Sequence, residues 1–253
     1  MNRIRLLVLC GVGALLGGVA AAADQAPNTL TPQEIKDGWK LLFDGKTTNG
    51  WRGAKLDRFP EFGWGVENGE LTVLESGGAE SRHGGDVVTV DQYGNFELSV
   101  EFKLTPGANS GIKYFVVGIE PGRPGSAIGL EYQILDDTRH PDATKGISGN
   151  RTLGSLYDLI PAVSDKPVKP VGEWNQARIL VDGKHVEHWL NGKKILEYER
   201  GSNAFLAHKA QSKFKGMAGF GEAPEGHILL QDHGNRVSYR NIKIRVIKPA
   251  KAS

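Results

Sequence analysis

The chain has 253 residues, of which 31 are Lys or Arg and 29 are Asp or Glu, so its formal net charge is only +2. This balance argues against nucleic acid or an anionic membrane surface as a partner, because both bind strongly basic proteins. The single cysteine, Cys10, rules out an internal disulfide and a cysteine-based metal site, so a buried core must supply the stability.

Residues 1–23 are typical of a secretory signal peptide. Arg3 and Arg5 precede an apolar run that contains several glycines, and three alanines at 21–23 offer a cleavage site. The run is short and no stop-transfer charges follow it, so no integral membrane segment is expected in the mature protein. Cleavage after Ala23 would remove Cys10 and release the chain into the periplasm or the medium.

Residues 24–37 are polar and are predicted to form an N-terminal linker with one helical turn at 32–36. The remainder, 38–248, is predicted to be a single domain of short strands, with no long helical period and no internal repeat. The expected strands are 39–43, 64–67, 70–74, 86–90, 96–104, 111–117, 129–135, 178–181, 185–190, 194–198, 217–220, 226–232 and 237–247.

Tight turns and alternation define the fold class. Asn68-Gly69, Asp182-Gly183 and Asn191-Gly192 are dipeptides that favour two-residue hairpin loops. Residues 96–104 alternate apolar and polar side chains throughout, as a half-buried strand does. Consecutive antiparallel strands cannot cover their own apolar face, so a second sheet must do so. The sequence therefore predicts an all-β, two-sheet antiparallel sandwich.

Residues 136–170 interrupt this pattern with prolines, glycines and mixed charges. A loop of this length inside a compact domain is uncommon and often shapes a binding site.

The strand at 129–135 is the first candidate for a functional surface. Alternation places Glu131 and Gln133 on the face opposite Tyr132. A carboxylate beside an amide is suited to binding sugar hydroxyl groups, although an ordinary solvated strand face would have the same pattern. Asp136 begins the long loop and could equally be a turn residue.

Two histidines are candidates for acid–base chemistry. His188 shares a strand face with Val186 and Leu190, so it is either a catalytic base or a hydrogen-bonded core histidine. His185 lies three residues earlier, on the opposite face, so the two are not expected to bind one metal ion. His233 lies at a strand end, from which a side chain can enter a cleft.

Seven short motifs occur together along the chain: Leu41-Leu42-Phe43-Asp44-Gly45-Lys46, Ser110-Gly111-Ile112-Lys113-Tyr114, Glu131-Tyr132-Gln133-Ile134-Leu135-Asp136, Gly154-Ser155-Leu156-Tyr157-Asp158, Gly172-Glu173-Trp174-Asn175, His188-Trp189-Leu190-Asn191-Gly192 and Leu230-Gln231-Asp232-His233-Gly234. As a set they resemble the 3-keto-disaccharide hydrolase family of secreted bacterial proteins. The resemblance implies a concanavalin A-like jelly roll that binds sugar on its concave sheet.

The resemblance also implies a chemistry. A ketone at C3 of a glycoside acidifies the hydrogen on C2, so a base can remove it and the group at C1 can leave, after which water adds. This route needs one base and one electrophile, not two carboxylates at a fixed separation. We expect His188, His233 and Glu131 to be the catalytic residues. The expected substrate-binding residues are Gln133, Lys113, Tyr157, Asp136, Asn191 and Gln231.

Two alternatives remain open from the sequence. The domain could be a non-catalytic carbohydrate-binding module, because a fold does not fix a function. It could also be a conventional glycosidase that uses Glu131 with Glu187 or Asp136. No metal-ligand set is defined, although a divalent ion held by Glu131, His188 and a third group is an option. The expected partner is a small carbohydrate, with no obligatory protein partner.

Overall fold

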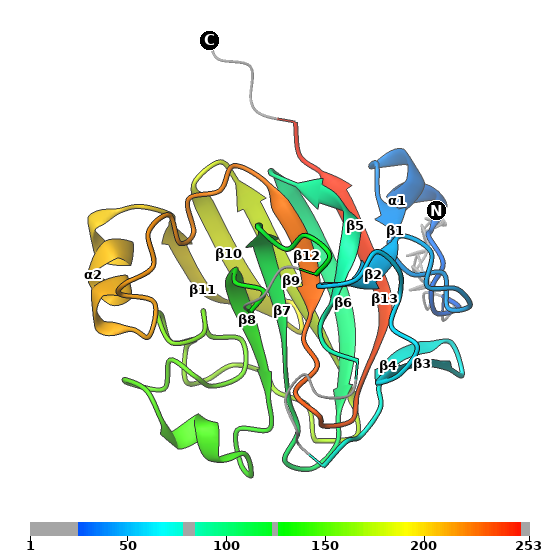
Figure 1. Cartoon of the computed structure of the whole chain (residues 1–253), viewed down its shortest axis with the longest axis horizontal. Helices are drawn as coiled ribbons and strands as arrows, with labels where there is room; N and C mark the ends of the chain where they lie inside the picture. The colour runs from blue at the N-terminus through cyan, green and yellow to red at the C-terminus, as the bar shows by residue number, and fades with distance from the viewer. Residues whose placement is uncertain (1–24, 78–83, 123–125, 249–253) are drawn as a thin grey trace, which may run out of the picture.

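The computed structural model describes residues 25–77, 84–122 and 126–248, and it has two antiparallel sheets packed face to face (Figure 1). The predicted all-β, two-sheet jelly-roll sandwich is confirmed. The predicted signal peptide at 1–23 lies outside the described residues.

The larger sheet has eight strands. Seven follow one another in the order β11 (Lys193–Glu199), β10 (His185–Leu190), β9 (Trp174–Asp182), β6 (Phe96–Leu104), β13 (Val237–Val246), β4 (Glu70–Val73) and β3 (Trp64–Glu67), and β1 (Lys40–Leu41) also pairs with β13. The smaller sheet has the order β2 (Trp51–Gly53), β5 (Val87–Tyr93), β12 (Gly226–Leu230), β7 (Asn109–Val116) and β8 (Leu130–Leu135).

The core lies between the two sheets, and β6 shows why this sequence forms it. Phe96, Leu98, Val100 and Phe102 are at most 1% exposed and point into the core, as the predicted alternation requires. Facing side chains from the smaller sheet, such as Tyr132 of β8, complete the packing.

Two of the three predicted hairpin turns are confirmed, and the third is shifted by one residue, because Asp182 pairs with His185 and the loop is Gly183-Lys184. Asn191 and Gly192, between β10 and β11, both have positive φ (46° and 82°), and Asn68 and Gly69, between β3 and β4, have 52° and 78°. Positive φ at both central positions is the geometry that matches the twist of a two-stranded ribbon.

The N-terminal segment packs against β13. Helix α1 (Pro32–Lys36) is preceded by the N-cap residue Thr31, which forms a capping box with Glu34, and it confirms the predicted helical turn. Asn28 and Asn241 form a reciprocal pair, in which each backbone N–H donates to the side-chain oxygen of the other at 2.6 and 2.8 Å. Lys243 forms an ion pair with Glu34 at 2.8 Å. Residues 28–36 are therefore held against the fold, whereas a linker was expected for 24–37.

Helix α2 (Asn203–Gln211) was not predicted. It lies beside the β11 edge of the larger sheet (Figure 1), where Phe205 stacks on Tyr198 at a centroid separation of 5.8 Å. Phe205 is its one buried residue, so the helix has no apolar stripe for a periodicity search to find. Among the helices of the described residues, none is long and apolar enough to cross a membrane.

The strand predicted at 217–220 is wrong. These residues lie in the loop after α2, where Gly219 and Gly221 have φ values of 69° and 77° that interrupt an extended backbone.

The long loop, residues 136–170, covers the outer edge of β8 and forms backbone hydrogen bonds with it. It contains a short 3₁₀ helix, η1 (Pro141–Thr144). The N–H of Gly154 donates to the carbonyl of Gln133 at 2.8 Å, and that of Tyr157 donates to the carbonyl of Glu131 at 3.0 Å. All six residues of β8 are consequently buried, on both faces of the sheet.

Candidate active site

A polar cavity of about 90 Å³ lies on the outer face of the smaller sheet. It is lined by side chains from β7, β8, the long loop and the segments that follow α2 and β12, namely Asn109, Glu131, Gln133, Tyr157, Lys213, Gln231 and His233. Five of the nine predicted site residues meet here, although they come from three separate parts of the chain. We call this space the inner cavity.

Glu131 is the central group of the inner cavity. It is only 5% exposed, and it lies over Gly111 of the neighbouring strand β7, where a side chain would collide with it. Burial raises the pKa of Glu131, whereas the positive charges of Lys113 and Lys213 partly oppose that rise. A carboxylate with a raised pKa is a usable proton acceptor close to neutral pH.

Gln133 holds the Glu131 carboxylate in place. With its side-chain amide oriented so that the nitrogen faces acceptors, this nitrogen lies 3.2 Å from Oε1 of Glu131 and 3.0 Å from the carbonyl oxygen of Ser110. Across the cavity, Oε1 of Gln231 is buried and has no hydrogen-bond partner among the described residues. A buried acceptor without a partner is costly unless a ligand or water donates to it, so this atom indicates a binding position for a hydroxyl group.

Lys213 completes the cavity and was not predicted. Its backbone N–H donates to Asp158 at 2.7 Å, and its ammonium group lies 4.3 Å from the ring centre of Tyr157. Burial of that group lowers the pKa of Lys213, and Glu131 opposes the change. No local motif marks this residue, because it lies in a polar segment that only the folded chain brings to the cavity.

Tyr157 is fixed by an ionic network in the long loop. Its hydroxyl donates to Asp142 at 2.8 Å, and Arg151 bridges Asp142 and Asp158 at 3.1 and 2.6 Å. Burial and the Asp142 carboxylate raise the pKa of Tyr157, so this phenol stays protonated. Burial alone would raise the pKa of Asp142, but its hydrogen bonds from Tyr157 and Arg151 hold it below the usual value.

His233 forms a pair with His140, whose ring centre lies 6.1 Å away with the ring planes nearly perpendicular. Nδ1 of His140 accepts the N–H of Asp142 at 3.1 Å, so its proton is on Nε2. Burial, followed by the charge of His233, lowers the pKa of His140. The two imidazoles give the cavity a second group able to transfer protons.

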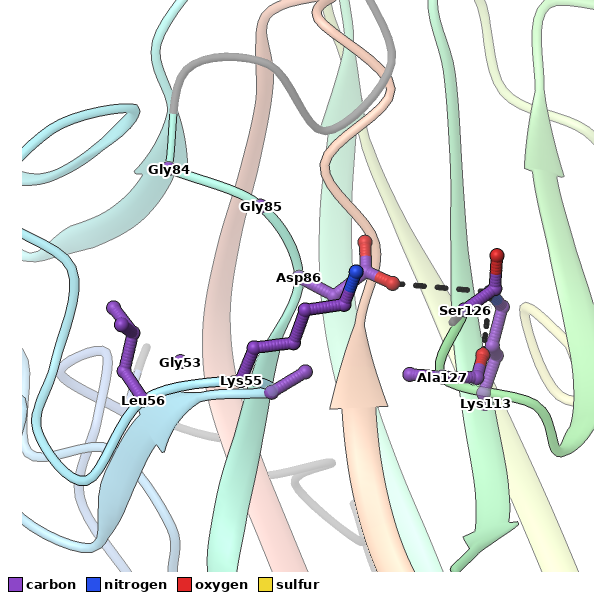
Figure 2. Close-up of a pocket in the computed structure, with 10 residues that line it drawn as sticks. Gly53, Lys55, Leu56, Gly84, Gly85, Asp86, Lys113, Ser126 and Ala127 are labelled. Carbon is purple, nitrogen blue, oxygen red and sulfur yellow. Dashed lines mark hydrogen bonds and ion pairs between the residues drawn. The ribbon is translucent and has the colours of Figure 1, made fainter. Parts of the chain in front are cut away.

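Lys113 lies at the border of the inner cavity. It is the cross-strand partner of Glu131 on β7, and its ammonium group lies 3.9 Å from Asp86 and 3.3 Å from the carbonyl of Ala127. It also lines a second cavity of about 420 Å³ on the same face of the sheet (Figure 2). We call this space the outer cavity.

Three predicted site residues do not reach either cavity, which corrects the expectation for each. His188 is completely buried between the sheets, where Nε2 is 2.8 Å from the Tyr114 hydroxyl and Nδ1 donates to the carbonyl of Gly154 at 2.9 Å. Burial lowers its pKa to about 4, so it is a neutral core histidine. The face that it shares with Val186 and Leu190 is the core face of β10.

Asp136 and Asn191 have structural roles. Asp136 accepts hydrogen bonds from Gly107, Thr138 and Arg139, and these bonds outweigh burial and lower its pKa to about 2. Asn191, in the turn after β10, accepts the N–H of Gln176 at 2.8 Å.

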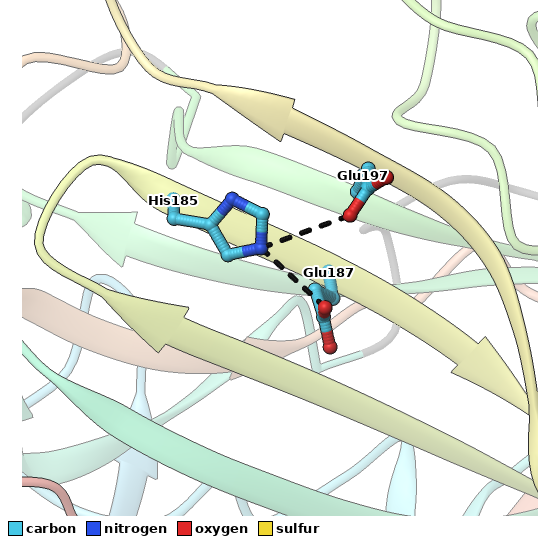
Figure 3. Close-up of side chains that lie close together, drawn as sticks. All are labelled: His185, Glu187 and Glu197. Carbon is cyan, nitrogen blue, oxygen red and sulfur yellow. Dashed lines mark hydrogen bonds and ion pairs between the residues drawn. The ribbon is translucent and has the colours of Figure 1, made fainter.

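A possible metal-binding group lies elsewhere, on the larger sheet. His185, Glu187 and Glu197 converge on the outer face of β10 and β11 (Figure 3). Lys194 already forms ion pairs with Glu187 at 3.2 Å and Glu197 at 2.6 Å, so a cation would have to displace its ammonium group. The optional ion site of Glu131, His188 and a third ligand is not formed by the described residues, because His188 and Glu131 lie on opposite faces of the smaller sheet.

Residues 38–245 match the family model described as the 3-keto-alpha-glucoside-1,2-lyase-like domain. A curated protein of Bacteroides thetaiotaomicron, named 3-keto-disaccharide hydrolase, is 40% identical over 231 residues, which cover 83% of this chain and 79% of that protein.

Two crystal structures from Parabacteroides distasonis ATCC 8503, both of provisionally assigned glycosyl hydrolases, are similar in sequence and in fold. The first has a TM-score of 0.78 and 31% identity, and it covers 88% of this chain and 100% of its own. The second has a TM-score of 0.60 and 28% identity, with coverage of 83% and 99%.

Proposed function

Because the chain belongs to the 3-keto-alpha-glucoside-1,2-lyase-like family, we propose that it cleaves the glycosidic bond of 3-keto-glycosides by elimination followed by hydration. The family assignment makes it a hydrolase that acts on glycosides. The observation that carries the finer proposal is a buried carboxylate of raised pKa in the inner cavity, Glu131, which interacts with the charges of Lys113 and Lys213.

The proposed reaction has two stages. Glu131 takes the proton from C2, and the electron pair moves to the C3 oxygen to give an enolate. As the ketone re-forms, the double bond moves to C1–C2, the C1–O bond breaks, and the departing oxygen takes a proton. Water then adds its oxygen to C1 and a proton to C2, so the net change is the addition of one water molecule.

The lysines supply the electrostatic part of this route. Lys213, which lies against Tyr157 and interacts with Glu131, is suited to stabilise the negative charge that develops on the C3 oxygen. His233, with His140 behind it, is suited to carry protons between the cavity and solvent. Gln133 and Gln231 would orient the sugar hydroxyl groups.

The positions of the carboxylates disfavour the two-carboxylate glycosidase. Glu131 is the one carboxylate that lines the inner cavity within the described residues. Glu187 lies on the outer face of the other sheet, and Asp136 is occupied by its hydrogen bonds. A carboxylate pair that flanks one bond is the basis of that mechanism.

One assay separates the three functions. The purified protein is incubated in D₂O with a disaccharide and with its 3-keto counterpart, and sugar release and deuterium at C2 are followed by NMR. We expect release from the keto sugar alone, with deuterium incorporated at C2, and loss of both signals in Glu131→Gln. Equal cleavage of both sugars would identify a conventional glycosidase, and binding without release would identify a binding module.

We also propose that the mature enzyme acts in the periplasm or outside the cell, on the basis of the signal-peptide pattern at 1–23. Mass spectrometry of the protein recovered from a bacterial host should give an N-terminus at Asp24. An exported protein that retains residues 1–23 would contradict the proposed cleavage.

A further inference from the structure

We infer that the outer cavity is the subsite for the leaving group, and that this leaving group is a second sugar ring. The inference rests on the proposed function, because it assigns the part of the substrate that does not react. The cavity is lined by Gly53, Ala54, Lys55, Leu56, Gly84, Gly85, Asp86, Lys113, Ser126 and Ala127.

The size of the inner cavity requires a second subsite. Its volume of about 90 Å³ corresponds to about three water molecules, at about 30 Å³ each. This space is too small for the two rings of a disaccharide. The outer cavity, at about 420 Å³, falls in the range of about 300–1,000 Å³ that is usual for small-molecule sites.

The strand register connects the two cavities through Lys113. Glu131 on β8 is opposite Lys113 on β7, and Lys113 is opposite Leu229 on β12, which is in turn opposite Val88 on β5. Asp86 precedes β5 on the same face, so Lys113 lies between the strands that carry the two carboxylates. The charges of both Lys113 and Asp86 act on Glu131, which places the cavities side by side.

The position of Lys113 between the two cavities is suited to contact the glycosidic oxygen. The oxygen joins the reacting ring to the leaving group, so it must lie where one cavity meets the other. Lys113 is at that border, and its ammonium group could donate a hydrogen bond to the oxygen as the C1–O bond breaks. The geometry therefore assigns the reacting ring to the inner cavity and the leaving group to the outer one.

The lining of the outer cavity indicates the chemistry of its ligand. Ala54 and Ala127 belong to a small apolar cluster on the outer face of the sheet, with Val88, Val116, Ile119 and Leu229. Asp86, Lys55 and Lys113 line the same cavity, as Figure 2 shows. An apolar base with charged groups at its edge suits a sugar ring, which has an apolar face and hydroxyl groups around its rim.

A third cavity makes the choice of a sugar testable. It has about 360 Å³ and is lined almost entirely by apolar residues, including Phe115, Val117, Ile128, Met217 and Phe220. An apolar aglycone would be expected there, whereas a sugar would lose its hydrogen bonds to water without replacement.

The test fills each cavity with one tryptophan. Ser126→Trp changes an exposed residue of the outer cavity, and Leu56→Trp changes a second lining residue in case the first variant is unstable. Val117→Trp is the matched control, because this residue is 48% exposed and lines the apolar cavity. Each variant is assayed with a 3-keto-disaccharide and with methyl 3-keto-glucoside, which has no second ring.

We expect both outer-cavity variants to raise KM for the 3-keto-disaccharide by more than tenfold and to leave the methyl glycoside within about twofold of the wild type, since only the disaccharide would reach the filled space. Val117→Trp should change neither. Equal losses on both substrates, no loss on either, or a disaccharide-specific loss in Val117→Trp would overturn the inference.

Failure of the proposed function would have a different result. In that case the wild type would cleave neither keto sugar, and calorimetry with the parent disaccharide would still test the subsite. Weaker binding in Ser126→Trp than in Val117→Trp would support the outer cavity, and equal binding would overturn it.

Discussion

Gly111 is predicted to be essential for activity although it has no side chain. A Cβ at this position would lie 3.0 Å from Cδ and 3.1 Å from Cγ of Glu131, and closer still to Oε1. Carbon atoms in good contact are about 3.5–4.0 Å apart, so the carboxylate would have to move by roughly 0.5–1 Å. A misplacement of about 1 Å in a catalytic group can reduce a rate by about 100-fold. We therefore expect Gly111→Ala to lower kcat/KM by about that factor, equivalent to about 2.7 kcal/mol.

The assay is the cleavage of a 3-keto-disaccharide, with circular dichroism to confirm folding. Gly216→Ala is the matched control, because no atom lies within 4 Å of the added Cβ and the backbone there is unstrained. Combining Gly111→Ala with Glu131→Asp should cost less than the sum of the two single losses, since the shorter side chain removes the closest contact with the added Cβ. A folded Gly111→Ala variant with full activity, or strictly additive losses in the double variant, would refute this reasoning.

Three further predictions concern charge and burial. Lys213→Gln should move the acid limb of the pH profile of kcat/KM to higher pH, because Lys213 lowers the pKa of the proposed base Glu131. The control variant Lys215→Gln, at an exposed position nearby, should leave the limb where it is. An unmoved limb in Lys213→Gln would contradict the role of Lys213. The free energy of unfolding of the wild type should fall by about 3 kcal/mol between pH 6.5 and 4. As the pH falls, His188 is protonated in the unfolded chain before it is protonated in the folded protein, where its pKa is about 4. Urea titrations of His188→Gln should lack this loss, and the same loss in that variant would assign it to other groups. Glu187→Gln should retain wild-type turnover, since Glu187 lies on the other sheet, and a loss of 100-fold or more would restore the two-carboxylate mechanism.

Local patterns predicted the parts of this fold that local physics determines. Alternation identified β6, and positive-φ dipeptides identified the β3–β4 and β10–β11 turns. The face of β8 that carries Glu131 and Gln133 was predicted in the same way, because the period of a strand separates the two faces without reference to the rest of the chain.

The role of His188 could not be predicted from the strand period alone. The period correctly grouped His188 with Val186 and Leu190, but it could not determine which face of β10 lies against the core. That depends on how the second sheet packs. The motif match then favoured a catalytic role over the core role that burial supports.

Lys213 shows a second limit. It reaches the inner cavity from a loop after α2, a helix with one buried residue, and neither element has a periodic pattern. A site assembled from segments far apart in the chain depends on tertiary structure, and no spacing within the sequence encodes it.

The reciprocal hydrogen bonds of Asn28 and Asn241 hold the segment before α1 against the last strand, β13. Both residues have left-handed backbone geometry, with φ of 59° and 50°, and Asn28 also donates to the carbonyl of Gly69 at 2.8 Å. A proteolytic cut or deletion that removes Asn28 would therefore remove hydrogen bonds from two other places, Asn241 in β13 and Gly69 in the β3–β4 turn. Any trimmed version of this protein should begin before Asn28, even though the family match starts ten positions later.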